Sequence, residues 1–288
     1  MVVALDIGGT HVTAGRVALS SATVERHVRL TLPEDADRRE LLDRVAGTAA
    51  EVADGAVSRV GIAVPGPFDY ANGICLVAHK LEPIYGVDLR HELAGALRLP
   101  GAAIAFVNDA DAFLLGEWWA GAAVGRRRAV GVTLGTGLGS AFLEDGRIVD
   151  AGPRVPPEGS LHLVSYRGLP AEATISRAAL LARYGEPELD VRELATLARG
   201  GEARARLVFA EVAGALGELI APWLASFDAT CLVVGGSIAR AWDLLEQELR
   251  ETLRHLDLQT IAPAARLDEA ALLGAARHAA NASAAETP

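Results

Sequence analysis

Two glycine- and threonine-containing turns, each flanked by apolar runs, constrain the fold of this chain more than any other feature. The first lies in VVALDIGGTHVTAGRVAL at residues 2–19, and the second lies in AVGVTLGTGLGSAFLEDGRIV at residues 129–149. Glycine lets a backbone approach a phosphate closely and adopt positive φ angles, and successive N–H groups in such a turn form a concave anion site. The pair therefore predicts two phosphate-binding hairpins that face each other across a cleft, which favours an ATP-dependent kinase.

The polar residues of these turns fit that chemistry. The hydroxyls of Thr10 and Thr136 can donate to phosphate oxygens. Asp6 has the same sign of charge as a phosphate, so it is better suited to Mg²⁺ or its water ligands, since Mg²⁺ binds few carboxylates and keeps several waters. A tight hairpin turn without a ligand is the alternative for the first turn taken alone, and the second copy weakens that alternative.

Two other phosphate-binding patterns do not match the chain. A P-loop requires G-x-x-x-x-G-K-[ST], and no such string occurs. The glycines of residues 135–139 resemble a dinucleotide fingerprint, but that fingerprint requires a helix directly after it. Residues 140–149 instead indicate a strand, a turn and a second strand, so the dinucleotide interpretation is weak.

Composition excludes several classes of partner. The net charge of −10 and the lack of any basic block beyond residues 126–128 argue against a nucleic-acid-binding surface. Asp6 interrupts the N-terminal apolar run, so no signal peptide is expected, and no uninterrupted apolar segment is long enough to span a membrane. The only cysteines, Cys75 and Cys231, form no disulfide framework and predict a location in the reducing cytoplasm.

Strand and helix patterns alternate along the chain, which predicts the α/β class. Besides the two hairpins, strands are expected at residues 23–32, 60–64, 103–107 and 231–234, and helices at residues 38–53, 110–120, 173–183, 202–226, 241–256 and 268–281.

Asn108 and Asp109 follow one of these expected strands. Ligands of open α/β sheets bind beyond the carboxyl ends of the strands. A sugar hydroxyl is a poor nucleophile until a base removes its proton, and an Asp within hydrogen-bond reach can act as that base. Asp111 is the rival carboxylate, but on a helix it would point about 200° away from Asp109. The alternative is that Asn108 or Asp109 only caps the following helix.

A second strand end carries glycines. The strand at residues 231–234 leads into Gly235, Gly236 and a helix start, whose backbone N–H groups suit a nucleotide's ribose or phosphate. A simple packing turn explains this segment equally well.

Taken together, five sequence blocks resemble the ROK family of sugar kinases and sugar-responsive repressors, within the actin-like ATPase superfamily. The blocks occur in the family's order over nearly the whole chain: DIGGT at 6–10, GIAVPGP at 61–67, VNDADA at 107–112, TLGTGLG at 133–139 and VVGGSI at 233–238. The resemblance implies two ribonuclease-H-like lobes that close over a sugar and ATP in an active-site cleft. We expect a small lobe of residues 1–108, completed by a C-terminal helix at 268–288, and a large lobe of residues 109–267.

The resemblance also implies roles for individual residues. Asn108 contacts the sugar, and Asp109 is the general base. The remaining implied ligands serve ATP: Asp6, Gly8, Gly9 and Thr10 for phosphate and Mg²⁺, Thr136 and Gly137 for phosphate, and Gly235 and Gly236 for adenosine.

The chain departs from the family in its sugar segment. Many members carry Glu-x-Gly-His followed by a cysteine cluster that holds zinc, whereas here one extra residue separates Glu158 from His162 and no cysteine follows before Cys231. No structural zinc is therefore expected. Glu158 and His162 are candidates for sugar contacts or for purely structural roles, and Glu172 resembles the family's downstream sugar-binding Glu or is simply a helix-start Glu. Lys80 stands where the family commonly has Asn.

The function favoured is therefore phosphoryl transfer from ATP to a hydroxyl of a hexose. A sugar-sensing repressor would need a winged helix-turn-helix ahead of DIGGT, and the motif starts at residue 6. A non-catalytic sugar- or nucleotide-binding protein is a further alternative, as is a kinase that uses polyphosphate, although the acidic charge disfavours a long polyanion track. A homodimer is expected by resemblance alone.

Overall fold

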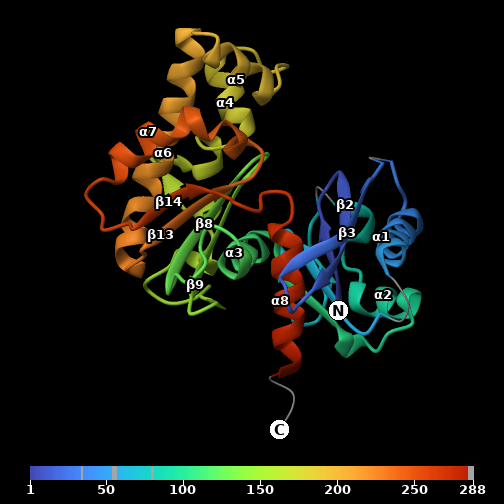
Figure 1. Cartoon of the computed structure of the whole chain (residues 1–288). Helices are drawn as coiled ribbons and strands as arrows, with labels where there is room; N and C mark the ends of the chain where they lie inside the picture. Colours follow the sequence, from blue (N-terminus) through green and yellow to red (C-terminus); the bar gives the residue numbers. More distant parts are fainter. Residues whose placement is uncertain (34, 54–56, 79–80, 285–288) are drawn as a thin grey trace. The chain divides into compact units, whose positions relative to one another are not determined.

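The chain folds into two compact α/β units (Figure 1). The computed structural model describes residues 1–33, 35–53, 57–78 and 81–284. The first unit comprises Met1–Ala120 together with the segment that begins at Asp268, and the second comprises Gly121–Leu267. The sequence analysis placed the boundary after residue 108. The structure instead assigns α3 (Asp109–Ala120) to the first unit, because α3 packs against the C-terminal helix α8 (Ala270–Ala284).

The first unit is built on a five-stranded sheet of order β3-β2-β1-β4-β7. Its first three strands are antiparallel neighbours, and its last two run parallel to β1. The strands are β1 (Val2–Ile7), β2 (His11–Ala18), β3 (Thr23–Thr31), β4 (Val60–Val64) and β7 (Ile104–Asn108).

The second unit repeats this arrangement with the order β10-β9-β8-β13-β14. Again a hairpin of antiparallel strands is followed by two strands that run parallel to the strand before the turn. The strands are β8 (Arg128–Leu134), β9 (Leu138–Glu144), β10 (Arg147–Ile148), β13 (Cys231–Gly235) and β14 (Thr260–Pro263). Two sheets of one topology confirm the α/β class and the paired ribonuclease-H-like arrangement.

Helices and short strands complete the units. The helices are α1 (Arg38–Val52), α2 (Leu89–Leu97), α4 (Arg177–Tyr184), α5 (Val191–Arg199), α6 (Ala203–Phe227) and α7 (Trp242–Leu253), besides α3 and α8. The short strands are β5 (Phe68–Asp69), β6 (Ile74–Cys75), β11 (Ser165–Tyr166) and β12 (Leu169–Pro170), and single 3₁₀ turns lie at Glu82–Ile84, Gly101–Ala103, Pro157–Gly159, Leu161–Leu163, Ala171–Ala173 and Ile238–Ala241.

Most expected elements are present within one to three residues of their predicted ends. The sequence analysis missed α2, α5 and β14, and also the two-residue strands β5, β6, β11 and β12. It also began α4 at residue 173, but a 3₁₀ turn precedes the helix and Ser176 is its cap, with Oγ accepting a hydrogen bond from the backbone N–H of Ala179 at 3.2 Å. Glu172 is consequently not part of the first turn of α4.

The C-terminal helix is seated on the first unit by glycines. A Cβ added at Gly61 of β4 would overlap the carbonyl oxygen of Ala275, and one added at Gly116 of α3 would overlap the carbonyl oxygen of Ala270. Reciprocally, a Cβ at Gly274 of α8 would overlap the carbonyl oxygen of Ala112. Backbone therefore approaches backbone at three points around α8, and α1 covers the other face of the same sheet (Figure 1).

The sequence analysis expected no apolar segment long enough to span a membrane, and helix α6 departs from that expectation. By length and composition alone this helix could cross a membrane, with a mean hydropathy of 1.5 over its most apolar window. Glu211 and Glu218 lie along it, and its apolar side chains, among them Phe209, Leu216 and Phe227, belong to the core of the second unit. Its hydropathy therefore reflects burial against the second sheet.

The two cysteines are in separate units. Cys75 lies in β6 and Cys231 lies in β13, both are buried, and within the described residues neither forms a disulfide bond.

The glycine contacts of α8 predict a large difference between two Gly-to-Ala substitutions in helices. Gly274→Ala forces a methyl group into the backbone of α3, and overpacking of this kind costs about 1–3 kcal/mol or more. Gly47→Ala in α1 is the matched control, because nothing lies within 4 Å of the added Cβ and Ala favours a helix by about 0.5–1 kcal/mol. Urea unfolding checks this, and equal midpoints for the two variants would contradict the close docking of α8.

Glu144 links β9 to three arginines in the second unit, Arg127, Arg128 and Arg154. Its carboxylate accepts hydrogen bonds from Arg154 Nη2 at 2.9 Å and from Arg128 Nε at 2.8 Å. These bonds, that to Arg154 first, lower the pKa of Glu144 to about 2. The lowered pKa means that the ionised carboxylate stabilises the folded state.

This pKa shift predicts a pH-dependent loss of stability in Glu144→Gln. The stabilisation is fully present above the ordinary pKa of 4.5 and disappears as the pH falls through about 2. The thermal midpoint of the variant should thus lie below that of the parent protein at pH 7, and the difference should vanish near pH 2. Asp145→Asn removes the same charge from an exposed neighbour and should change the midpoint little. A difference for Glu144→Gln that is independent of pH would show that the ion pairs do not cause it.

Candidate active site

The candidate residues of the first unit meet at one edge of its sheet. Strands β1, β4 and β7 are parallel, with Asp6 paired to Ala63 and Val64 paired to Asn108. Their carboxyl ends therefore lie side by side, and they carry Asp6, the Pro-Gly-Pro turn of residues 65–67, and Asn108 with Asp109. This is the edge at which open α/β sheets bind ligands.

The side chain of Asn108 is held from both ends. Its Oδ1 accepts the backbone N–H of Ala110 at 2.9 Å, and its Nδ2 donates to Tyr70 Oη at 3.0 Å. Tyr70 Oη in turn donates to the carbonyl oxygen of Val64 at 3.3 Å. A Cβ added at Gly66 would lie 3.5 Å from Tyr70 Oη. Asn108 is thus a cap of α3, as one interpretation of the sequence had it, with one amide hydrogen left to contact a ligand.

Tyr70 was not singled out from the sequence, since a lone tyrosine after a Pro-Gly-Pro turn carries no distinctive signal. Its hydroxyl joins the ends of β4 and β7.

Asp109 has a capping contact and a charge interaction. Its Oδ1 accepts the backbone N–H of Ala110 at 2.9 Å. Burial of Asp6, and next the negative charge of Asp109, raise the pKa of Asp6 to about 6, while the guanidinium of Arg29 opposes the rise. A carboxylate whose pKa is raised by burial and by a neighbouring carboxylate is one whose charged form a cation would stabilise.

Arg29 is a second residue that the sequence analysis missed. Asp6 is paired with Thr13 on β2, and Thr13 is paired with Arg29 on β3. Directly paired residues have side chains on the same face of a sheet, so Arg29 belongs to the row that contains Asp6. Only the register of three strands reveals this, because the two residues are far apart in the sequence.

The first hairpin loop is open. The N–H of Gly8 donates to the carbonyl oxygen of His11 at 2.9 Å and closes the turn, and Thr10 Oγ1 lies 2.8 Å from His11 Nδ1. Gly8 has no positive φ, and an added Cβ would make only an ordinary contact of 3.5 Å. Thr10 is exposed, while Gly8 and Gly9 are half-buried. The protein itself therefore does not require glycine at Gly8, which is consistent with space reserved for a ligand.

The second hairpin loop is fastened on two sides. The N–H of Gly135 donates to the carbonyl oxygen of Gly137 at 3.0 Å within the turn, and the N–H of Arg177 donates to the carbonyl oxygen of Gly135 at 2.8 Å. On the other side, the N–H of Leu138 donates to Glu172 Oε1 at 2.8 Å. The predicted phosphate residues Thr136 and Gly137 thus lie at a turn whose two flanks are fixed.

Gly236 brings the predicted adenosine turn against the same loop. It has a φ of 84°, and an added Cβ would overlap the carbonyl oxygen of Leu134. Gly235 pairs with Thr133 across β13 and β8, and a Cβ added at Gly135 would lie 3.6 Å from Ser237 Oγ. The turns after β8 and β13 are therefore adjacent, as both a nucleotide site and a packing turn require.

Glu158 and His162 lie on a segment that is anchored by a buried serine. Ser140 Oγ donates to the carbonyl oxygen of Gly159 at 2.7 Å and accepts the N–H of Leu161 at 2.8 Å. The side chains of Glu158 and His162 are exposed, and Glu158 has a φ of 55°. The backbone between them is fixed while both side chains stay accessible. His79 and Lys80, where the sugar segment also departs from the resembled pattern, lie outside the described residues.

The donor set of the first unit fits Mg²⁺. Within residues 1–33, 35–53, 57–78 and 81–284, no group of three or more His, Cys, Asp or Glu side chains is arranged to hold a metal ion. Mg²⁺ does not require such a group, because it is usually held by one or two carboxylates, phosphates and water. The half-buried Asp6 carboxylate, which interacts electrostatically with Asp109, supplies a donor of that kind.

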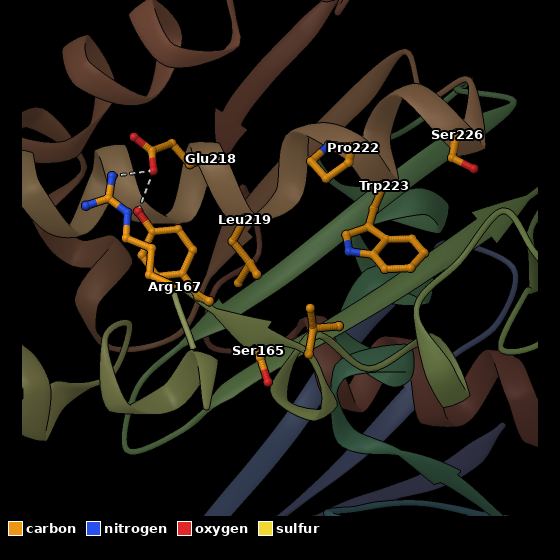
Figure 2. A pocket seen from close by; sticks show the side chains of 9 residues that line it. Ser165, Arg167, Glu218, Leu219, Pro222, Trp223 and Ser226 are labelled. Carbon is orange, nitrogen blue, oxygen red and sulfur yellow. Dashed lines mark hydrogen bonds and ion pairs between the residues drawn. The ribbon is translucent and has the colours of Figure 1, made fainter. Parts of the chain in front are cut away.

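A surface pocket of about 330 Å³ lies in the second unit (Figure 2). Leu219 and Trp223 of α6 line it, and Tyr166 Oη and Arg167 Nη2 both donate to Glu218 Oε2, at 2.5 Å and 2.8 Å. None of the sequence-predicted residues lines this pocket.

Comparison with known proteins agrees with the geometry. A sequence model described as "ROK family" matches residues 2–282. The chain belongs to the ROK family. The predicted family is thereby confirmed.

Proteins similar to this ROK chain include sugar kinases. It is 31% identical over 275 residues to a glucokinase of Thermotoga maritima, with 86% of each chain covered. The solved structure of a ROK hexokinase from Thermus thermophilus aligns with a TM-score of 0.78 at 26% identity, covering 99% of both chains. A ROK glucokinase from Streptomyces griseus, in complex with glucose and AMPPNP, aligns with a TM-score of 0.78 at 24% identity over 96% of this chain and 98% of its own. The last likeness concerns the fold alone.

The bridging position of Ser140 predicts that Ser140→Ala destabilises the ROK chain and loosens its sugar segment. The variant leaves the Gly159 carbonyl and the Leu161 N–H without a buried partner, which costs about 1–3 kcal/mol. Urea unfolding and limited proteolysis within residues 157–163 check this. Ser160→Ala is the control, since its exposed hydroxyl makes only a local bond to Glu158. An effect no larger than that of the control would contradict the anchoring role.

Proposed function

We propose that this chain is an ATP-dependent sugar kinase that transfers the γ-phosphoryl group of ATP to a hydroxyl of a hexose. The observation that supports it most is the placement of Asn108 and Asp109 at the carboxyl edge of the first sheet, where Asp109 and Asp6 interact electrostatically. The names of the Thermotoga and Thermus relatives, glucokinase and hexokinase, support the same class of reaction.

In this proposal Asp109 is the general base. It accepts the proton of the sugar hydroxyl as the oxygen attacks the γ-phosphorus, and the bond from the γ-phosphorus to the bridging oxygen breaks to release ADP. Asn108 orients the sugar with its remaining amide hydrogen, while its bonds to Tyr70 and Ala110 hold the amide in one orientation. Closure of the protein over its substrates would exclude water, which would otherwise hydrolyse ATP.

Asp6 would hold Mg²⁺ directly or through a water molecule. When bound, the ion neutralises charge on the phosphates. The role that this chain supplies is to keep one carboxylate at the end of β1 beside the proposed base. Arg29 adds a positive charge to the same row of the sheet.

The remaining predicted residues have proposed roles in binding. Gly8, Gly9 and Thr10 of the first loop, and Thr136 and Gly137 of the second, would bind phosphates. Gly235 and Gly236 would lie by the adenosine. Glu158, His162 and Glu172 would contact the sugar, the first two from exposed positions on a fixed backbone. Cytoplasmic location and a homodimer stay predictions.

A turnover experiment identifies which sugar and which phosphoryl donor the protein uses. Relatives carry different sugars in their names: an N-acetyl-D-glucosamine kinase of Photobacterium profundum is 26% identical over 284 residues. A solved inorganic polyphosphate/ATP-glucomannokinase of Arthrobacter sp. strain KM aligns with a TM-score of 0.70 at 27% identity. A panel of hexoses, amino sugars and N-acetylated sugars, each tested with Mg²⁺-ATP and with polyphosphate, covers these possibilities.

Asp109→Asn tests the proposed base. Loss of general-base catalysis should lower sugar-dependent ADP release by about 10²–10⁴-fold, while sugar binding, measured by calorimetry, stays largely intact because the amide has the same shape. Asp111→Asn makes the same chemical change two residues along α3 and should retain most turnover. Near-normal turnover in Asp109→Asn would refute the assignment.

Absence of sugar-dependent ADP release would change the proposal itself. If no sugar in the panel stimulates release with either donor from the folded protein, a non-catalytic sugar- or nucleotide-binding role becomes the better hypothesis. Binding calorimetry on the same panel then identifies the ligand.

A further inference from the structure

Glu172 is in direct contact with the loop that is proposed to bind phosphate. Its Oε1 accepts the backbone N–H of Leu138 at 2.8 Å, and a Cβ added at Gly137 would overlap the same oxygen. The carboxylate thus lies close to the α-carbon of Gly137 and accepts a hydrogen bond from the N–H of Leu138. The contact accounts for glycine at 137 without any ligand, since an alanine there would displace the carboxylate.

This contact has an electrostatic consequence for a polyanion. Backbone N–H groups make a turn attractive to phosphate, and here the carboxylate takes one such donor at the end of the turn. The carboxylate also places a negative charge beside Thr136 and Gly137, where a triphosphate would have to lie. The carboxylate and the phosphates have charges of the same sign, so they repel each other even when water partly screens them.

We propose that Glu172 is a gate on the second phosphate loop. In the sugar-free protein its carboxylate covers the Leu138 N–H and weakens the binding of a triphosphate, and a bound sugar draws the carboxylate away. The inference rests on the proposed kinase function and deepens it, because it makes ATP binding depend on the sugar. Glu172 would contact the sugar directly, whereas its effect on the triphosphate is exerted through the loop.

The sugar can withdraw the carboxylate by simple competition. The Glu172 residue is exposed, so its carboxylate is accessible to a ligand. A sugar hydroxyl donates to a carboxylate as a backbone N–H does, and a carboxylate can accept on both of its oxygens. A sugar whose hydroxyls bind both oxygens therefore draws the carboxylate away from the Leu138 N–H. Once the carboxylate moves toward the sugar, the Leu138 N–H and the space beside Gly137 become available to phosphate. Binding of sugar and triphosphate is then positively and reciprocally coupled.

The alternative role for Glu172 is a lock that only holds the loop in shape. The two roles predict opposite effects of Glu172→Gln. The glutamine keeps an oxygen that can accept the Leu138 N–H, so a lock would survive or weaken slightly, whereas the charge that opposes the triphosphate is lost. Glu172→Ala removes both the acceptor and the charge. Glu186→Gln, an exposed carboxylate in the loop after α4, controls for the change in net charge.

The test measures binding of AMPPNP with Mg²⁺, and of tripolyphosphate alone, by calorimetry on the full chain without sugar. For a gate, Glu172→Gln should bind both probes about fivefold more tightly than the parent protein, and its sugar-independent ATP hydrolysis should rise. Added glucose, or another sugar that the turnover panel identifies, should tighten AMPPNP binding to the parent protein and have a smaller effect on Glu172→Gln. Glu186→Gln should match the parent protein throughout.

The outcomes separate this inference from the proposed function. Sugar-dependent ADP release by the parent protein, with equal or weaker probe binding by Glu172→Gln, overturns the gate and leaves the kinase standing. Tighter tripolyphosphate binding by Glu172→Gln in a protein that releases no ADP supports the electrostatic contact and removes the kinase. Weaker binding by Glu172→Ala, together with unchanged binding by Glu172→Gln, identifies the lock and overturns the gate.

Discussion

The close docking of α8 on the first sheet and on α3 is the constraint on which the first unit depends. Gly61, Gly116 and Gly274 each take a position at which a methyl group would overlap a carbonyl oxygen of the neighbouring element. Because α3 begins at Asp109, the packing that seats α8 also sets the direction of the helix whose first residue is the proposed base. The C-terminal segment therefore contributes to the candidate site without supplying a side chain to it.

Both units place their polar groups by the same device, the shared carboxyl edge of parallel strands. In the first unit this edge brings together Asp6 and Asn108, and a tyrosine hydroxyl joins the ends of β4 and β7. In the second unit it brings together the turns after β8 and β13, where Gly236 meets Leu134. Tyr70 joins the strand ends of the first unit, and Ser140 anchors the segment between Glu158 and His162 in the second. Neither residue carries a catalytic signal of its own, yet each helps to determine where candidate residues lie.

The sequence analysis was most successful where the information is local. Apolar runs between glycine turns located β1, β4, β8 and β13, because such runs have one obvious burial pattern. It failed for α2, α5 and β14, and for the start of α4, where a Ser cap outweighed the apolar spacing. It did not anticipate the membrane-like hydropathy of α6, since a helix in the core of a unit is apolar for the same reason as a membrane span.

The sequence by itself determined the family, the α/β class and the two glycine hairpins, because each depends on residues that are close together in the chain. Only the tertiary structure decided that α3 belongs to the first unit, that Arg29 shares a row with Asp6, and that the carboxylate of Glu172 lies on the second hairpin loop. Glu172 and Leu138 are 34 residues apart. Such a contact is set by how the segments pack, which residue type and local spacing do not encode.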